Sequence, residues 1–575
     1  PTLAERQLKV LDLFQHINEP ATSTIIQSDA TSFKGIDENI SKYGWYLPRS
    51  VPFSVNEPAH SFEALTLFNV LYSAKEYDTF YNTAAYLRDI VNEGIFVYSV
   101  SIAVIYRKDT QTIALPPIYE TFPSLFNNGE TIATAERINV HGQRNIKNYP
   151  STYSSDGNVI IKANATEWSL ENNPLSYFTN DYDLNAAQYF LSLVTPYWLG
   201  GQLKPSVIYK ERRGEAWWFA HRQLVARYYL ERLSNGLGEI PEITNVVEQG
   251  FTSGLVYSNG VPFPSRPDNY RLDQPKLASA LKKVEEFENR IWEAIDKGFF
   301  VNRQGQSISL LSDAGIDILG RLIESNADSP NLTFNMTFKS IDYATALRDP
   351  VFYSLWKRIL NLFVYWQKQM PLYKPEELIL PNVEIEKVEV DKLVTFFEYS
   401  LLNVTSNTVV LVEHQRLNHK PFTVSVDVKS DAAKKVLVKL FLAPKYDSNG
   451  YEIPLQLNTE NFFMLDQFIS ELKVGDTVIT RKSSDFVYTA KEAPTSWEIA
   501  EEILAGKWTP KSKTVSLPYV TLFLVVYLQE FDGYKQPYSS DYRITGFPSD
   551  RPLYKYQIKD VKNLKFQDVK IFHEE

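Results

Sequence analysis

The sequence predicts an α+β protein of three domains, two of them helical and the third built of β-strands. With 575 residues, the chain is longer than a single hydrophobic core supports. Its apolar fraction of 44% and charged fraction of 22% are typical of a globular protein. Apolar residues recur at helical spacing up to about residue 374 and alternate from residue 375 onward. This change of period separates a helical part from a β part.

The first predicted domain, residues 1–152, is helical. Residues 64–107 carry apolar side chains three or four positions apart, with few Gly or Pro residues to interrupt them. The segment PPIYETFPSLFNN at 116–128 closes this block with Pro and Asn residues that favour turns. We therefore expect an all-α domain here.

The second predicted domain, residues 153–374, begins with a strand-like stretch, NVIIKANATEW, at 158–168. Four long segments with amphipathic helical spacing follow it. They lie at residues 183–198, 212–238, 275–300 and 348–370. Four helices of this kind predict an antiparallel four-helix bundle.

The third predicted domain, residues 375–575, alternates apolar and polar residues as half-buried strands do. Turn signals such as YDSNG at 446–450 separate these stretches. The strand-like stretches are KLVTFFEY, PFTVSVDV, KKVLVKLFLAP, TVSLPYVTLFLVVYL and KFQDVKIF. So many strands at this spacing predict an antiparallel sandwich or barrel.

Charge and hydropathy exclude several classes of partner. The formal net charge is -10 and no basic block occurs, so we expect neither nucleic acid nor an anionic membrane as a partner. The longest apolar run, VTLFLVVYL at 520–528, is too short to span a bilayer and is interpreted as a buried strand. No signal-peptide pattern is present, and a first residue other than Met is compatible with a processed chain.

Two residue types are present in unusual amounts. Cysteine is absent, so the sequence offers neither disulfides nor thiolate ligands and nucleophiles. By contrast, 35 Tyr, 34 Phe and 10 Trp make up 14% of the chain and are spread over all its regions. A core needs fewer aromatic rings than this, so the composition itself is a candidate functional property.

His221 is the single histidine of the helical segment RRGEAWWFAHRQLVARYYLERLSNGLG at 212–238. A second metal ligand on the same helix face would lie three or four residues away. Those positions hold residues that bind no transition metal: Trp217, Trp218, Leu224 and Val225. Because a zinc or copper site needs about three or four N or S donors, we expect no metal here. His221 is predicted to be a buried, hydrogen-bonded histidine.

No catalytic site is predicted elsewhere. The sequence contains no nucleophile elbow, phosphate-binding loop or dinucleotide-binding fingerprint. His414 and His419 are five residues apart, which in a strand points them to opposite faces. We expect both to be structural or surface residues.

Five Asn-X-Ser/Thr motifs are candidate N-glycosylation sites. Their asparagines are Asn39, Asn164, Asn331, Asn335 and Asn403. Together with the lack of cysteine and of a membrane segment, they favour a secreted glycoprotein. Asn164, at the edge of the strand-like stretch, is the first choice for an occupied site.

Several segments, in collinear order over nearly the whole chain, resemble the arthropod haemocyanin superfamily. The resemblance is greatest to the insect hexamerins of the aromatic-rich arylphorin type. The segments are RRGEAWWFAHRQLVARYYLERLSNGLGEIPE, YFTNDYDLN, SNGVPFPSRPDNY, ALRDPVFYSLWKRI, RLNHKPFTVSVDV, LFLAPKYDSNG, GFPSDRPL and FQDVKIFHE. The resemblance implies an α-helical first domain, a four-helix-bundle second domain and an immunoglobulin-like β-sandwich third domain.

The resemblance also implies what His221 is. Oxygen-carrying haemocyanins and the related phenoloxidases bind two coppers through six histidines on the bundle helices. The ligand positions of one copper fall on Gln188, Ser192 and His221, and one position of the other falls on Trp356. The remaining two ligand positions of the family lie in a connecting segment that is much shorter in this sequence, at residues 329–350. His221 is then the only one of the six ligands to be retained, and the copper site is degenerate.

By this resemblance the protein is a copper-free haemolymph storage protein, a reserve of amino acids and of aromatic rings for cuticle tanning. An oxygen carrier or phenol oxidase would need histidines that the chain lacks, so neither an enzyme nor a cofactor is expected. The alternative is a carrier of a small apolar ligand or hormone. Expected partners are a homohexamer, alone or with paralogous subunits, and a fat-body uptake receptor. The expected location is extracellular, in haemolymph, followed by storage in the fat body.

Overall fold

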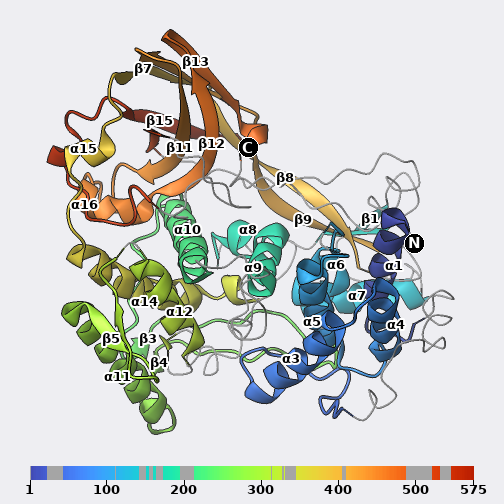
Figure 1. The fold of residues 1–575 in the computed structure, drawn as a ribbon. Coiled ribbons are helices and arrows are strands. Elements are labelled where there is room, and N and C mark those ends of the chain that lie inside the picture. The colour runs from blue at the N-terminus through green and yellow to red at the C-terminus, as the bar shows by residue number, and fades with distance from the viewer. Residues whose placement is uncertain are drawn as a thin grey trace.

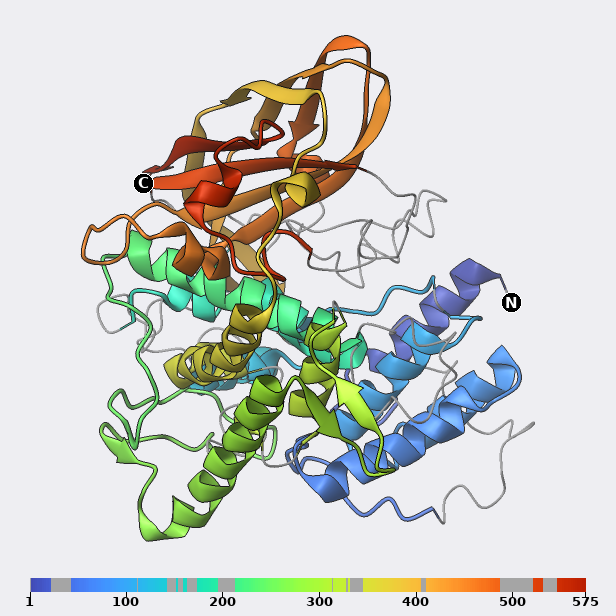
Figure 2. The same ribbon diagram turned by 60° about the vertical axis from the view of Figure 1, so that its left-hand side comes forward.

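A computed structural model confirms the predicted fold class: a helical first domain, a helical central domain and a β-domain (Figure 1). Figure 2 shows the β-domain lying against one end of the central helices. No described helix is both long and apolar enough to cross a bilayer. The structure describes residues 2–21, 43–110, 112–141, 151–153, 159–162, 173–194, 213–312, 314–326, 329–330, 345–404, 410–486, 521–530 and 546–574.

The first domain is built around α5 (Glu93–Tyr106), which is apolar and buried on nearly all sides. Asn92 caps this helix, because its side-chain oxygen accepts hydrogen bonds from the backbone N–H groups of Gly94 and Ile95. α3 packs along α5. The other helices are α1 (Leu3–Phe14), α3 (Pro58–Tyr72), α4 (Tyr77–Leu87), α6 (Ile118–Thr121), η2 (Pro123–Leu125) and α7 (Gly129–His141).

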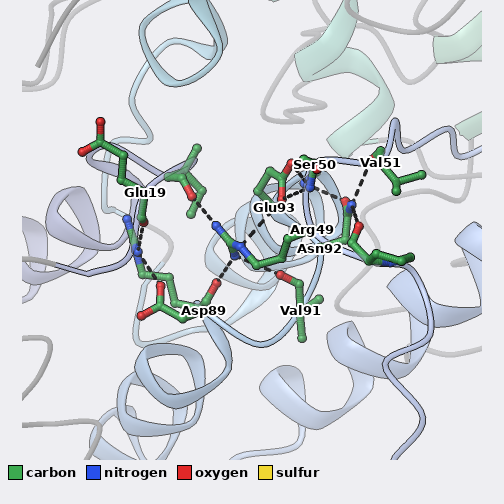
Figure 3. A network of polar contacts seen from close by, with 12 residues as sticks. Glu19, Arg49, Ser50, Val51, Asp89, Val91, Asn92 and Glu93 are labelled. Atoms are coloured by element: carbon green, nitrogen blue, oxygen red, sulfur yellow. Dashed lines mark hydrogen bonds and ion pairs between the residues drawn. The ribbon is translucent and has the colours of Figure 1, made fainter. Parts of the chain in front are cut away.

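Polar side chains hold the loops before α5 in place. Figure 3 shows Asn92 and Glu93 reaching the loop at Ser50 and Val51, and Arg49 reaching from this loop to Val91. Arg49 Nη1 donates to the backbone carbonyl of Val91 at 3.1 Å, and Asn92 Nδ2 donates to that of Val51 at 2.9 Å. Glu93 accepts from the Ser50 N–H at 2.8 Å. These side chains satisfy backbone groups that no helix or strand pairs.

The central domain contains the four long helices that the periodicity predicts. They are α9 (Tyr182–Val194), α10 (Arg213–Ser234), α11 (Pro275–Lys297) and α14 (Pro350–Gln369). α11 begins with Pro275 at its first position and ends at Gly298, whose left-handed φ of 81° suits a helix cap. Shorter elements are α8 (Ser176–Thr179), β3 (Val246–Val247), β4 (Tyr270–Arg271), β5 (Phe299–Val301), β6 (Ser307–Ser309), η6 (Ala346–Arg348) and α15 (Pro375–Leu378).

A fifth central helix, α12 (Gly315–Ser325), is absent from the sequence-based prediction. It packs closely against α10 because both helices carry a glycine at the crossing. A Cβ atom on Gly320 would lie 2.3 Å from the backbone oxygen of Gly214. α12 is therefore a closely packed helix of the bundle. α11, by contrast, packs on α14 and leaves most of its surface exposed to solvent.

The third domain contains two sheets, β13-β10-β7 and β1-β2-β9-β8-β15-β14-β11-β12. Its strands are β7 (Val383–Val390), β8 (Leu393–Asn403), β9 (Val410–His419), β10 (Thr423–Ser430), β11 (Lys434–Pro444), β12 (Phe463–Leu472), β13 (Gly475–Lys482), β14 (Thr521–Glu530) and β15 (Leu564–Glu574). Its short helices are α16 (Leu455–Asn458), η7 (Thr459–Asn461), η8 (Ser483–Asp485) and η9 (Lys555–Ile558). Valine and leucine side chains of both sheets form one core.

The pairing is not purely antiparallel, which corrects the prediction in one respect. β15 pairs with β8 in parallel, and β2 (Val159–Lys162) pairs in parallel with β9. β2, with β1 (Ser151–Tyr153) beside it, comes from the junction of the first two domains. The long β8–β9 hairpin reaches from the β-domain to this junction (Figure 1). Backbone hydrogen bonds therefore join the β-domain to this junction.

Candidate functional site

His221 lies near the middle of α10, a helix that is buried between two cores. Trp217, Trp218 and Phe219 pack into the core of the central domain, whereas Ala226 and Leu230 pack into that of the β-domain. The amide of Gln223 bonds in both directions to the Met464 backbone of β12, at 3.0 and 2.8 Å. α10 thus holds His221 in a rigid and largely dry environment.

Both ring nitrogens of His221 are engaged. Nδ1 lies 2.8 Å from the backbone oxygen of Trp217, one turn earlier in α10. A carbonyl oxygen can only accept, so Nδ1 carries the proton and Nε2 of the neutral ring accepts. The side-chain amide of Gln188, on α9, donates to this Nε2 at 3.0 Å. The lone pair with which a histidine would bind a metal is therefore used for a hydrogen bond to Gln188.

Burial keeps the His221 ring neutral. It lowers the pKa of His221 to about 4, because the charged ring would lose its hydration, and the bond to the Trp217 carbonyl only partly opposes this. An ordinary histidine would titrate near pH 6.5. The ring therefore stays neutral over the physiological range and acts as a fixed acceptor for Gln188.

Trp356, on α14, covers one face of the His221 ring. The two ring centroids are 3.7 Å apart and the planes differ by 8°. Trp217 meets Trp356 edge to face at 4.8 Å, and Phe352 lies 6.4 Å from His221. Trp356 is fully buried, and its indole Nε1 has no hydrogen-bond partner among the described residues. Aromatic rings thus fill the space next to the histidine.

Ser192 does not join this cluster through a hydrogen bond. Its hydroxyl donates to the backbone oxygen of Tyr189, in its own helix, at 2.5 Å. Of the four predicted ligand positions, the structure brings together Gln188, His221 and Trp356.

These residues do not fit copper. The cluster offers one imidazole with both nitrogens occupied, one amide acting as a donor, and an indole in place of a ligand. Copper needs about three nitrogen or sulfur donors, which must be free to coordinate it. In the part of the chain that the structure describes, no group of three or more His, Asp or Glu side chains is arranged to hold a metal ion. The arrangement serves packing rather than chemistry.

A buried polar layer between α9 and β9 escaped the sequence-based prediction. Arg416 of β9 forms an ion pair with Asp183 at 3.0 Å. The His414 ring, also on β9, stacks on Tyr182 with centroids 3.8 Å apart. Asp181 precedes α9 and accepts a hydrogen bond from the backbone of the helix. The run TNDYDLN contains Asp and Asn residues of the kind that cap helices, which is a local signal in the sequence. The β9 residues that contact this run lie more than 200 residues further along the chain, so the sequence does not show them as partners.

The predicted glycosylation sites lie almost entirely outside the described residues. Asn39, Asn164, Asn331 and Asn335 are all outside them. The backbone of Asn403 ends β8, but its side chain is outside the description.

Three family models match the chain in consecutive order. They are "Hemocyanin, all-alpha domain" over residues 3–112, "Hemocyanin, copper containing domain" over 117–342, and "Hemocyanin, ig-like domain" over 372–517. Among solved structures, a scorpion haemocyanin superposes with a TM-score of 0.81 at 28% identity, covering 100% of both chains. The three-domain order of the haemocyanin fold is thus confirmed.

Three similar curated proteins come from insects. Acidic juvenile hormone-suppressible protein 1 of Trichoplusia ni is 43% identical over 87% of this chain and 89% of its own length. Arylphorin subunit alpha of Manduca sexta is 32% identical over 99% of this chain and 92% of its own. Hexamerin 70b of Apis mellifera is 30% identical over 100% of this chain and 95% of its own. The chain therefore belongs to the haemocyanin family, among its arylphorin and hexamerin members.

Proposed function

We propose that this protein is a copper-free storage protein of insect haemolymph, a reserve of amino acids and of aromatic rings in particular. The observation that carries the proposal is the contact of His221 with Gln188 and Trp356, which occupies both the lone pair and a face of the imidazole. The kinship with arylphorin and hexamerin and the aromatic content of 14% support it. The protein acts as a reserve and not as an enzyme.

In this proposal Gln188, Ser192, His221 and Trp356 stand at former copper-ligand positions. An apolar, stacked core there stabilises the helices instead of binding a metal. Burying a large side chain fully contributes about 1.5–3 kcal/mol, so Trp356 in place of a ligand favours the folded chain.

The proposal includes assembly and transport. Relatives include proteins named as subunits, and closed symmetry is the usual state of large homo-oligomers, which favours a homohexamer. Secretion into haemolymph, N-glycosylation with Asn164 as the first site, and recovery by a fat-body receptor complete the proposed cycle. Glycopeptide mapping of protein from the native source tests Asn164, and a bare Asn164 would contradict the glycoprotein proposal.

Stage-resolved quantification of the protein in haemolymph and fat body tests storage directly. A reserve should accumulate before metamorphosis, pass into the fat body, and then decline as its tyrosine and phenylalanine are consumed. A constant low level through development would contradict storage.

A further inference from the structure

A cavity of about 350 Å³ lies in the first domain, between α3 and the segment that precedes it. Its volume is within the range of small-molecule sites, roughly 300–1,000 Å³. Tyr43, Tyr46 and Phe62 supply aromatic walls, and His60 and Glu63 supply polar groups. The cavity is far in sequence from the His221 cluster, and the storage proposal does not involve it.

Glu63 is the unusual member of this lining. Its side chain is only 6% exposed. Oε2 accepts a hydrogen bond from the Leu47 N–H at 3.2 Å, but Oε1 is buried and has no hydrogen-bond partner among the described residues. Burial raises the pKa of Glu63, which the backbone N–H groups of Leu47 and Tyr46 partly oppose. Buried carboxylate oxygens are normally satisfied, so this one calls for a donor.

His60 does not neutralise that carboxylate. Its Nδ1 accepts from the Ser54 N–H at 3.1 Å, so the neutral ring carries its proton on Nε2. Burial lowers the pKa of His60, with the charge of Glu57 opposing the shift. No ion pair to Glu63 forms among the residues that the structure describes. The described residues therefore supply no counter-charge for this carboxylate.

The aromatic walls suit a positively charged group. Tyr46 is 85% exposed and Phe62 is 72% exposed, so their rings are open to an incoming molecule at the rim of the cavity. Aromatic faces attract ammonium groups, and the attraction is greater where water is displaced. A carboxylate in the lining of the same cavity favours an organic cation over an anion or a neutral molecule.

We propose that this cavity is a binding site for a small organic amine, whose ammonium group pairs with the Glu63 carboxylate while its apolar part lies against Tyr46 and Phe62. The ligand class is a primary arylalkyl or alkyl ammonium ion of about one ring in size. This activity is separate from storage, and its failure would leave the storage proposal unchanged.

Calorimetric titration of the intact, assembled protein with phenethylammonium chloride tests the site. We expect one site per chain with a Kd below about 1 mM. Two probes of the same size isolate the charge: 2-phenylethanol should bind at least about tenfold more weakly, and 3-phenylpropionate should not bind. Absence of heat with the amine, or equal binding of the alcohol, would overturn the proposal.

Variants then locate the site. Glu63→Gln keeps the acceptor for the Leu47 N–H but removes the charge, and should weaken amine binding about tenfold or more. Tyr46→Ala should also weaken it, whereas Tyr451→Ala, a tyrosine 72% exposed in the β-domain, should not. Unchanged binding by Glu63→Gln would contradict the assignment. The probe series on the unaltered protein decides the matter if Glu63→Gln fails to fold.

Discussion

At the scale of single residues, Gln188 and His221 form a matched donor–acceptor pair that can be tested as a pair. Gln188→Leu leaves the Nε2 of His221 buried without a donor, which should cost about 1–3 kcal/mol. His221→Phe should likewise leave the Gln188 amide unpaired. The double variant replaces both partners with apolar groups, so its cost should be smaller than the sum of the two single costs. Urea and thermal unfolding of the parent, the two single variants and the double variant give the four free energies of unfolding from which this coupling is calculated.

An exposed glutamine provides the control. Gln304→Leu, in the exposed loop between β5 and β6, should change the unfolding midpoint little. Strict additivity of Gln188→Leu and His221→Phe would contradict the hydrogen bond.

Two buried tryptophans of α14 offer a second comparison at this scale. Trp366 Nε1 donates to the Leu310 carbonyl at 2.6 Å, whereas Trp356 Nε1 has no partner among the described residues. Trp366→Phe leaves a buried carbonyl unpaired, but Trp356→Phe removes an unpaired donor. We expect Trp366→Phe to be more destabilising, by about 1–2 kcal/mol, in denaturant unfolding. Equal costs would mean that Trp356 Nε1 is hydrogen-bonded in solution.

The sequence allowed part of this site to be predicted. A lone histidine on a helix without neighbours at ligand spacing already indicated a buried, hydrogen-bonded residue. The contact with Gln188 was beyond reach, because it depends on how α9 and α10 are packed and on the His221 tautomer that the bond to the Trp217 carbonyl selects. The stacking of Trp356 likewise depends on the placement of a third helix.

At the scale of elements, the N-terminus of α9 couples the central domain to β9. Asp181 accepts from the Leu184 N–H at 2.9 Å, and Asp183 pairs with Arg416. Burial, followed by the charge of Asp183, raises the pKa of Asp181 to about 6 from an ordinary 3.8, while Arg416, the Leu184 N–H and Arg227 oppose the shift. The folded protein thus binds a proton here at a pH where the unfolded chain does not.

The sign of the pH effect follows from that difference. Asp181 should add stability as the pH falls through about 6, and the gain should be complete near 3.8. Thermal unfolding of the parent and of Asp181→Asn, at about pH 7.5 and at about pH 5, measures this effect. The free energy of unfolding of the parent relative to that of the variant should increase by on the order of 1–3 kcal/mol from the higher to the lower pH. The comparison is needed because His414 acts in the opposite direction, since burial lowers its pKa to about 3. A constant difference between parent and variant would contradict the prediction.

Long elements were easier to predict than short or distant pairings. α11 was recognisable because its apolar stripe, Pro275 and Gly298 all agree. α12 escaped prediction because it has only 11 residues and two of them are glycines, which are poor helix formers. The pairing of β2 with β9 joins strands some 250 residues apart in the chain, and no local pattern encodes such a partner.

At the scale of the whole molecule, we expect a hexamer. Native mass measurement at neutral pH should give about six times the chain mass of 66.2 kDa. Apolar side chains exposed on α11 and β5, including Trp292 and Phe299, are candidates for burial between subunits. A monomer at micromolar concentration would contradict the assembly.

The assembled protein should neither retain copper nor oxidise phenols, and the reason is the donor set. The His221 Nε2 must break its bond to Gln188 before it can coordinate a metal, and Trp356 covers one face of the ring. Gln188→His with Ser192→His adds imidazoles on α9 alone, so it should create at most a weak single-metal site. Elemental analysis and catechol oxidation assays of the parent and this double variant measure both properties. Near-stoichiometric copper in the parent, or catechol oxidation by it, would contradict the storage role, because a metal could bind only if the aromatic packing around His221 were absent in solution.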